Sequence, residues 1–265
     1  MFKEVFSMER KLIDKIDFNC DLAQCFGVYK NASEYELLDY VSSANISCGF
    51  HAGDPSSIKE ALLAAKERNV VVGAHIGFDD IQGFGYNPMN LSEEDLEALV
   101  IYQISAISSF AKVYNMEIEY VRPHGAMYVM AAQDPQFAIS LAKAIRKCSE
   151  WLVYYGAYGE ATEQVSEYLN IAHEISLEKT YNADGSVDFS ANDIENTNVS
   201  ISRLKELLNN SQVMNNECGK TVVKADTIHF TNRISNSLDL ISQAKGIITP
   251  LPVNYKNACA SGWVG

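Results

Sequence analysis

Short apolar runs of strand length alternate with segments of helical pattern along most of this 265-residue chain. The clearest run, Val-Val-Val-Gly-Ala-His at residues 70–75, is almost wholly apolar, as expected of a strand covered on both faces of a parallel sheet. Further strands are predicted at residues 17–21, 43–48, 118–121, 151–155, 172–177 and 222–229. The resulting seven βα units fit a seven-stranded β/α barrel or a doubly wound open sheet, and the length suits one domain spanning residues 1–265.

The segments between these strands carry helix signals. Asp54 followed by Pro55 is typical of a helix cap and first position, and this helix is predicted to end near residue 69. Ser92, which three acidic residues follow, is predicted to begin a helix that reaches residue 115. Other helices are predicted at residues 35–41, 134–148, 162–169, 203–208 and 238–243. Residues 182–199, rich in Asn, Asp and Ser, are predicted to form a long loop.

The chain is acidic, with a formal net charge of −13 and a sequence pI of about 4.8. That balance argues against polyanionic partners, so we expect neither a nucleic-acid surface nor binding to an anionic membrane. The N-terminal residues lack a signal-peptide pattern, no later run is expected to span a membrane, and the six cysteines are expected to be reduced thiols. These features together predict a cytoplasmic protein, and they leave a homo-oligomer open.

Four of the five histidines lie where a predicted strand gives way to a loop: His51, His75, His124 and His229. Asp21 ends the first predicted strand in the same way. In a β/α barrel all these positions fall on the rim at the carboxyl ends of the strands, where barrel enzymes carry their chemistry. We therefore predict that Asp21, His51, His75 and His124 converge on one site.

A carboxylate and several imidazoles around one cavity are a usual ligand set for a divalent metal such as zinc, iron, manganese or nickel. Asp21, His51, His75 and His124 are the candidate ligands, and a metal there would activate water and polarise a carbonyl. The metal-free alternative is acid–base catalysis, in which His51 or His124 moves a proton and Asp21 orients the ring. Asp21, His51 and His124 are the candidate catalytic residues. His173 fits no motif and is assigned a structural or surface role.

Several motifs resemble those of one known family. They are Asn19-Cys20-Asp21-Leu22, Ser43-Ala44-Asn45-Ile46, Cys48-Gly49-Phe50-His51-Ala52-Gly53-Asp54-Pro55, Gly73-Ala74-His75, Gly83-Phe84-Gly85, and Pro123-His124-Gly125-Ala126 with Tyr128. Together they look like the successive motifs of the LamB/YcsF family, over roughly residues 16–245. The resemblance implies that family's fold, a distorted, TIM-like seven-stranded β/α barrel related to glycoside hydrolases and polysaccharide deacetylases.

The family includes the 5-oxoprolinase A subunit, so the resemblance implies a hydrolase acting on the C–N bond of a small cyclic amide, 5-oxoproline or a related lactam. No ATP-binding motif is visible in the sequence, and any use of ATP would rest with partners, the B and C subunits of 5-oxoprolinase. Asn19, Gln24, Asn45, Arg122 and His229 are the expected substrate contacts. Two alternatives stay open: a member that binds a small ligand or a partner without turnover, and a metal-dependent deacetylase-like hydrolase.

The chain also departs from the family's pattern. Gln24 stands where the family usually has a glutamate, Tyr86 and Asn87 replace paired arginines, Arg122 replaces a lysine, and Thr231 replaces an aspartate. A carboxamide cannot accept a proton as a general base. If the loss of that carboxylate weakened the chemistry, Gln24→Glu should raise lactam opening or leave it unchanged.

Overall fold

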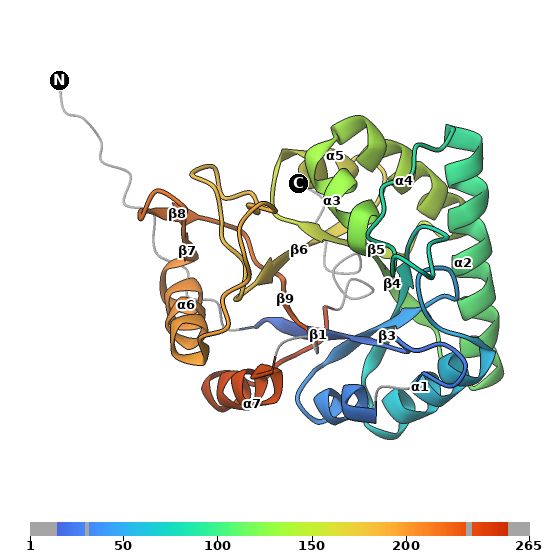
Figure 1. Cartoon of the computed structure of the whole chain (residues 1–265), viewed down its shortest axis with the longest axis horizontal. Coiled ribbons are helices and arrows are strands. Elements are labelled where there is room, and N and C mark those ends of the chain that lie inside the picture. Colours follow the sequence, from blue (N-terminus) through green and yellow to red (C-terminus); the bar gives the residue numbers. More distant parts are fainter. Residues whose placement is uncertain (1–14, 30–31, 232–234, 254–265) are drawn as a thin grey trace.

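The computed structural model of the chain describes residues 15–29, 32–231 and 235–253. Seven parallel strands close into a barrel in the order β1-β2-β3-β4-β5-β6-β9 (Figure 1). These strands are β1 (Asp17–Leu22), β2 (Ser43–Ser47), β3 (Val71–Ile76), β4 (Ile118–Pro123), β5 (Val153–Ala157), β6 (Asn170–Ser176) and β9 (Thr227–Phe230). Closure confirms the seven-stranded barrel and excludes the doubly wound sheet.

Helices surround the barrel (Figure 1). They are the 3-10 helix η1 (Ala32–Asp39) and the α-helices α1 (Pro55–Glu67), α2 (Glu93–Val113), α3 (Gly125–Gln133), α4 (Pro135–Cys148), α5 (Glu160–Val165), α6 (Thr197–Asn210) and α7 (Ser237–Ile247). Asp54 caps α1 as predicted, because its side chain accepts hydrogen bonds from the backbone N–H groups of Ser56 and Ser57. The five described cysteines form no disulfide.

Three elements differ from the sequence prediction. Helix α3 is absent from that prediction, because its residues are apolar around most of the helix and no side chain caps its first turn. The single strand predicted over 222–229 is wrong: Val222 ends β8 (Lys220–Val222), which pairs with β7 (Gln212–Met214) in a separate antiparallel sheet, and only Thr227–Phe230 joins the barrel. Helix α6 begins inside the predicted loop, at Thr197.

Helix α2 is the one described helix long and apolar enough to cross a membrane, with a mean hydropathy of 1.3 over its most apolar window. No membrane-spanning segment is expected from the sequence. In the fold, its buried residues Leu96, Val100, Ile104 and Ile107 belong to the same core as the barrel strands, and α2 packs against α4 and β3. Core helices of globular proteins have this composition, so the barrel accounts for the apolar face.

Candidate active site

The rim at the carboxyl ends of the strands gathers most of the predicted residues. Asp21 lies on β1, His75 on β3, Arg122 on β4 and His229 on β9. The parallel register places His75 beside Arg122. His51 lies on the loop between β2 and α1, and His124 immediately precedes α3. The barrel thus brings residues from five βα units to one end.

His51, His75 and His124 form a buried cluster in which one ring nitrogen of each lies within 4.8 Å of the others. The rings of His51 and His124 stack with centroids 4.0 Å apart, and His75 meets both edge-on. Nδ1 of His51 is buried and has no hydrogen-bonding partner among the described residues. Burial lowers the pKa of His51 well below its usual range and that of His124 to about 3, so both rings are neutral near pH 7.

Hydrogen bonds to the backbone determine the tautomers of two of these rings. Nδ1 of His75 lies 3.0 Å from the carbonyl oxygen of Arg122, and Nε2 of His124 lies 2.7 Å from that of Phe84. A carbonyl only accepts, so each of these nitrogens carries a hydrogen. The remaining nitrogens, Nε2 of His75 and Nδ1 of His124, are 3.1 Å apart and would oppose two lone pairs. A positive charge between them would remove this repulsion.

A metal ion fits this arrangement. Two ring nitrogens 3.1 Å apart can both reach one ion at the usual metal–nitrogen distance of about 2.1 Å. Metal-binding histidines normally donate their other N–H to a carbonyl or carboxylate, which is what His75 and His124 do. Asp21 adds a carboxylate, because its Oδ1 lies 3.3 Å from Nε2 of His75. The histidine triad is therefore able to bind a metal, and its donors suit a borderline transition metal.

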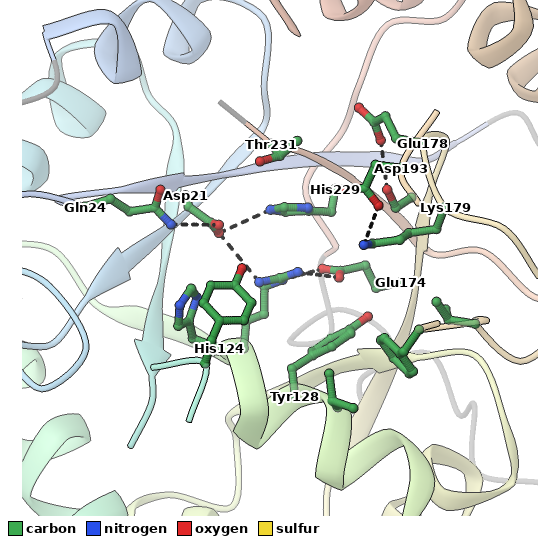
Figure 2. Close-up of a pocket in the computed structure, with 17 residues that line it drawn as sticks. Asp21, Gln24, His124, Tyr128, Glu174, Glu178, Lys179, Asp193, His229 and Thr231 are labelled. Atoms are coloured by element: carbon green, nitrogen blue, oxygen red, sulfur yellow. Dashed lines mark hydrogen bonds and ion pairs between the residues drawn. The ribbon is translucent and has the colours of Figure 1, made fainter. Parts of the chain in front are cut away.

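Asp21 is the charged centre of the site (Figure 2). Its Oδ1 lies 3.2 Å from Nε2 of His229 and 3.6 Å from Nη1 of Arg122, and Gln24 donates from Nε2 to its Oδ2 at 3.0 Å. Burial by itself would raise the pKa of Asp21, but the neighbouring His75, His229 and Arg122 outweigh burial and hold this pKa well below its usual range. The carboxyl group is therefore ionised at neutral pH.

A loop covers the histidine cluster from outside. The carbonyl of Phe84 accepts from His124, and the carbonyl of Gly85 accepts from the backbone N–H of Ala126 at 2.8 Å. The ring of Phe84 also meets His124 edge-on at 5.0 Å. Gly125 has a φ of +54°, and a Cβ there would lie 2.3 Å from the carbonyl oxygen of Gly85. Only glycine allows the loop to approach this closely.

Next to the cluster is a cavity of about 120 Å³. It is lined by Asp21, Gln24, Tyr86, Arg122, His124, Gly125, Tyr128, Val129, Glu174, Ser176, Glu178, Lys179, Val187, Phe189, Asp193, His229 and Thr231. His51 and His75 lie behind His124 and do not line it. The cavity has room for roughly one small ring, and a ligand in it would reach the histidine cluster through Asp21 and His124.

The predicted substrate contacts fall into two sets. Gln24, Arg122 and His229 line the cavity, whereas Asn19 and Asn45 are fully buried and do not. Asn45 donates to Asp21 at 2.9 Å and to the side-chain oxygen of Asn19 at 2.8 Å. Asn19 and Asn45 therefore lie inside the barrel, where they orient the site from within.

His173 lies away from this site, as its lack of a motif suggests. It is buried, and its two ring nitrogens lie 2.9 Å from Asp226 and 3.1 Å from Glu163. Both partners are carboxylates of the surrounding scaffold, which gives His173 a structural role.

Three acids of the cavity are missing from the sequence prediction: Glu174, Glu178 and Asp193. Glu174 receives two hydrogen bonds from Arg122, at 2.7 and 2.8 Å, and Glu178 is only 2% exposed. One signal was available, because Glu174 interrupts an apolar strand, and a charge buried in a strand usually has a partner. Glu178 follows the end of that strand in a turn and carried no such signal.

Comparison with known proteins gives consistent matches. The model of the LamB/YcsF family matches residues 16–254. The 5-oxoprolinase A subunit of a Bacillus cereus strain is 39% identical over 219 residues, which are 80% of this chain and 87% of that protein. The 5-oxoprolinase A subunit of Bacillus subtilis is 36% identical over 219 residues, with coverages of 81% and 85%. The lactam utilization protein from Thermus thermophilus has a TM-score of 0.84 at 30% identity, over 90% of this chain and 100% of that one.

Proposed function

Because the chain belongs to the LamB/YcsF family, we propose that it is a hydrolase that opens a small cyclic amide at the rim site, as the A component of a 5-oxoprolinase-type enzyme. Relatives of 36–39% identity bear the name of the 5-oxoprolinase A subunit, and the similar solved structure is named a lactam utilization protein. The observation that carries the proposal is the pair of opposed nitrogens of His75 and His124, beside ionised Asp21 at the end of a small cavity.

We assign His51, His75 and His124, with Asp21 beside them, to hold a divalent metal. When bound, such an ion supplies Lewis-acid polarisation of a carbonyl and a lowered pKa of water, both of which amide hydrolysis needs. The family match and the donor set support this assignment.

Lactam opening adds the hydroxyl of water to the carbonyl carbon, breaks the C–N bond and leaves a proton on the ring nitrogen. We assign this proton transfer to His229, because its ring lines the cavity and Asp21 orients it at 3.2 Å. Val187 and Phe189 line the cavity too, where they would exclude water from the ring carbons of the substrate. Glu174 holds the guanidinium group of Arg122 in place, and this group keeps a positive charge beside Asp21.

We further propose that ATP enters the reaction only through partner subunits. The letter in the relatives' name implies further subunits, and the sequence shows no phosphate-binding motif of its own. The chain alone should therefore bind lactams, and coupled turnover should need the other subunits.

The test is a hydrolysis assay on the purified chain, alone and with the B and C subunits of a relative, with 5-oxoproline and pyrrolidin-2-one as substrates. We expect release of the open amino acid with partners and ATP, loss of turnover after chelation, and recovery when a divalent metal is added. His124→Asn should abolish turnover, whereas the control His173→Asn should keep it. Ligand binding without turnover under every condition would favour the non-catalytic alternative.

A further inference from the structure

The cavity carries more acidic than basic side chains. Asp21, Glu174, Glu178 and Asp193 line it, against the two cations Arg122 and Lys179 and the histidine His229, which lies against Asp21. The lining therefore has an excess of carboxyl groups wherever a ligand would sit, and the adjacent histidines His51 and His124 are neutral. A cavity of this composition attracts positive charge and repels a carboxylate.

Both cations are already paired within the protein. Arg122 donates to Glu174 from Nε and Nη2 at 2.7 and 2.8 Å, in the bidentate geometry typical of a strong pair. Nζ of Lys179 lies 2.5 Å from Oδ1 of Asp193. A carboxylate on the substrate would have to break one of these pairs to gain a cationic partner from either side chain.

Glu178, in contrast, has a carboxyl oxygen that can accept a hydrogen bond from a ligand. Its Oε2 accepts a hydrogen bond from Oγ of Ser176 at 2.8 Å, but its Oε1 is buried without a partner among the described residues. Figure 2 shows Glu178 beside Asp193, on the far side of His229 from Gln24. A buried carboxyl oxygen without a hydrogen bond is unfavourable, so a donor from a ligand would be bound favourably there.

We propose that Glu178 determines specificity by accepting a hydrogen bond from a positively charged nitrogen of the substrate, so that the cavity selects amino-substituted cyclic amides over carboxylate-substituted ones. The proposal rests on the proposed function for the lactam ring. The ring carbonyl would lie towards Asp21 and His124, and the ammonium group would lie between Glu178 and Asp193. Burial raises the pKa of Glu178, and a cation beside it would favour the ionised form.

Three ligands with the same five-membered ring test this proposal: 5-oxoproline, 5-oxoprolinamide and 5-(aminomethyl)pyrrolidin-2-one, which are anionic, neutral and cationic at pH 7. Isothermal titration calorimetry of the metal-loaded chain measures each affinity. We expect the cationic ligand to bind at least tenfold more tightly than the anionic one, with the neutral amide between them. Tighter binding of 5-oxoproline, or no measurable binding of the aminomethyl ligand, would overturn the proposal.

The variant Glu178→Gln keeps the size of the side chain and removes its charge. It should lower the affinity for the cationic ligand about tenfold and change the affinity for the neutral amide less than twofold. An almost unchanged affinity for the neutral amide also shows that the cavity is intact. Glu160→Gln, on α5, is the control for the loss of one negative charge elsewhere. Equal affinity of Glu178→Gln and wild type for the cationic ligand would mean that Glu178 is uncharged in the complex and would overturn the proposal.

Hydrolysis of the same three ligands, with partner subunits and ATP present, separates the proposal from the function on which it rests. If the aminomethyl ligand binds through Glu178 but no ligand is hydrolysed, lactam hydrolysis is wrong and the specificity stands. If 5-oxoproline is both the tightest ligand and the best substrate, the function stands and the specificity is wrong.

Discussion

Nδ1 of His124 faces Nε2 of His75 at 3.1 Å, while the other nitrogen of each ring is bonded to a backbone carbonyl. The backbone therefore turns two lone pairs toward each other, next to the carboxylate of Asp21. Such an arrangement is unfavourable without a cation, because two buried lone pairs that face each other repel. A cation between them makes it favourable. The geometry makes metal binding the first property to measure.

We expect the purified chain to bind about one divalent transition metal per molecule, and His75→Asn to weaken binding roughly 100-fold. At a free metal concentration of about 100 times the dissociation constant, the metal should add about 3 kcal/mol to the free energy of unfolding. Elemental analysis, titration calorimetry and thermal unfolding with and without chelator measure these effects. His173→Asn, which changes a buried histidine outside the cluster, is the matched control. Equal metal content in the two variants, or no metal in wild type, would contradict a metal site.

Gln24→Glu should lower activity, contrary to the expectation from the sequence. The sequence alone suggests a lost base, but Gln24 donates to Oδ2 of Asp21 at 3.0 Å, and a glutamate would place a second carboxylate at that distance. Like charges this close are destabilising, so the new side chain either moves out or disturbs Asp21. We expect lactam turnover to fall about tenfold or more, since an increase of roughly 1.4 kcal/mol in the activation free energy is enough for that change.

Gln24→Met separates loss of the donor from repulsion, because methionine has a similar length and no charge. Turnover should decrease in the order wild type, Gln24→Met, Gln24→Glu. A Gln24→Glu enzyme faster than wild type would restore the interpretation of Gln24 as a lost base.

The sequence predicts those parts of the structure in which the residue pattern follows the repeated βα unit. Strand periodicity predicts the βα units, and their ends place His75 and Arg122 on one rim. Periodicity does not predict how deeply each residue of the site is buried: His124 lines the cavity, yet its side chain is only 3% exposed and stacks on His51. Glu178 is brought to the cavity by a turn, and contacts of this kind depend on tertiary packing, which has no period in the sequence.

Asp17, at the opposite end of β1 from Asp21, should make stability depend on pH. Its carboxyl group is buried, with the hydroxyl groups of Ser42, Ser43 and Thr227 at 2.6, 2.7 and 2.5 Å. Burial raises its pKa to about 6, and these hydrogen bonds oppose the rise only in part. Below the unfolded value of 3.8 the group is protonated in both states; between 3.8 and 6 only the unfolded chain ionises; above 6 both states do.

This contribution to stability is therefore fully present below pH 3.8, is lost as pH rises through 6, and is constant above that. The total loss is about 3 kcal/mol, at about 1.36 kcal/mol per unit of pKa shift. Urea unfolding of wild type and Asp17→Asn from about pH 4 to pH 8 measures it, and the difference between the two curves isolates Asp17 from other buried acids. Parallel curves would contradict a raised pKa at Asp17.

Gly125→Ala should damage the site through the loop that covers it. An alanine Cβ would lie 2.3 Å from the carbonyl oxygen of Gly85, in a backbone conformation with a φ of +54°. Gly27→Ala is a matched control, because Gly27 has a φ of +59° but no heavy atom within 4 Å of an added Cβ. The free energy of unfolding of the control should fall only by the conformational cost of about 1 kcal/mol. That of Gly125→Ala should fall by roughly 2–4 kcal/mol, since strain and a steric clash add. Displacement of the loop would also release Phe84 from His124, so metal affinity should fall in Gly125→Ala alone. Equal unfolding free energies for the two variants, measured in urea, would mean that the contact between Gly85 and Gly125 does not hold the loop.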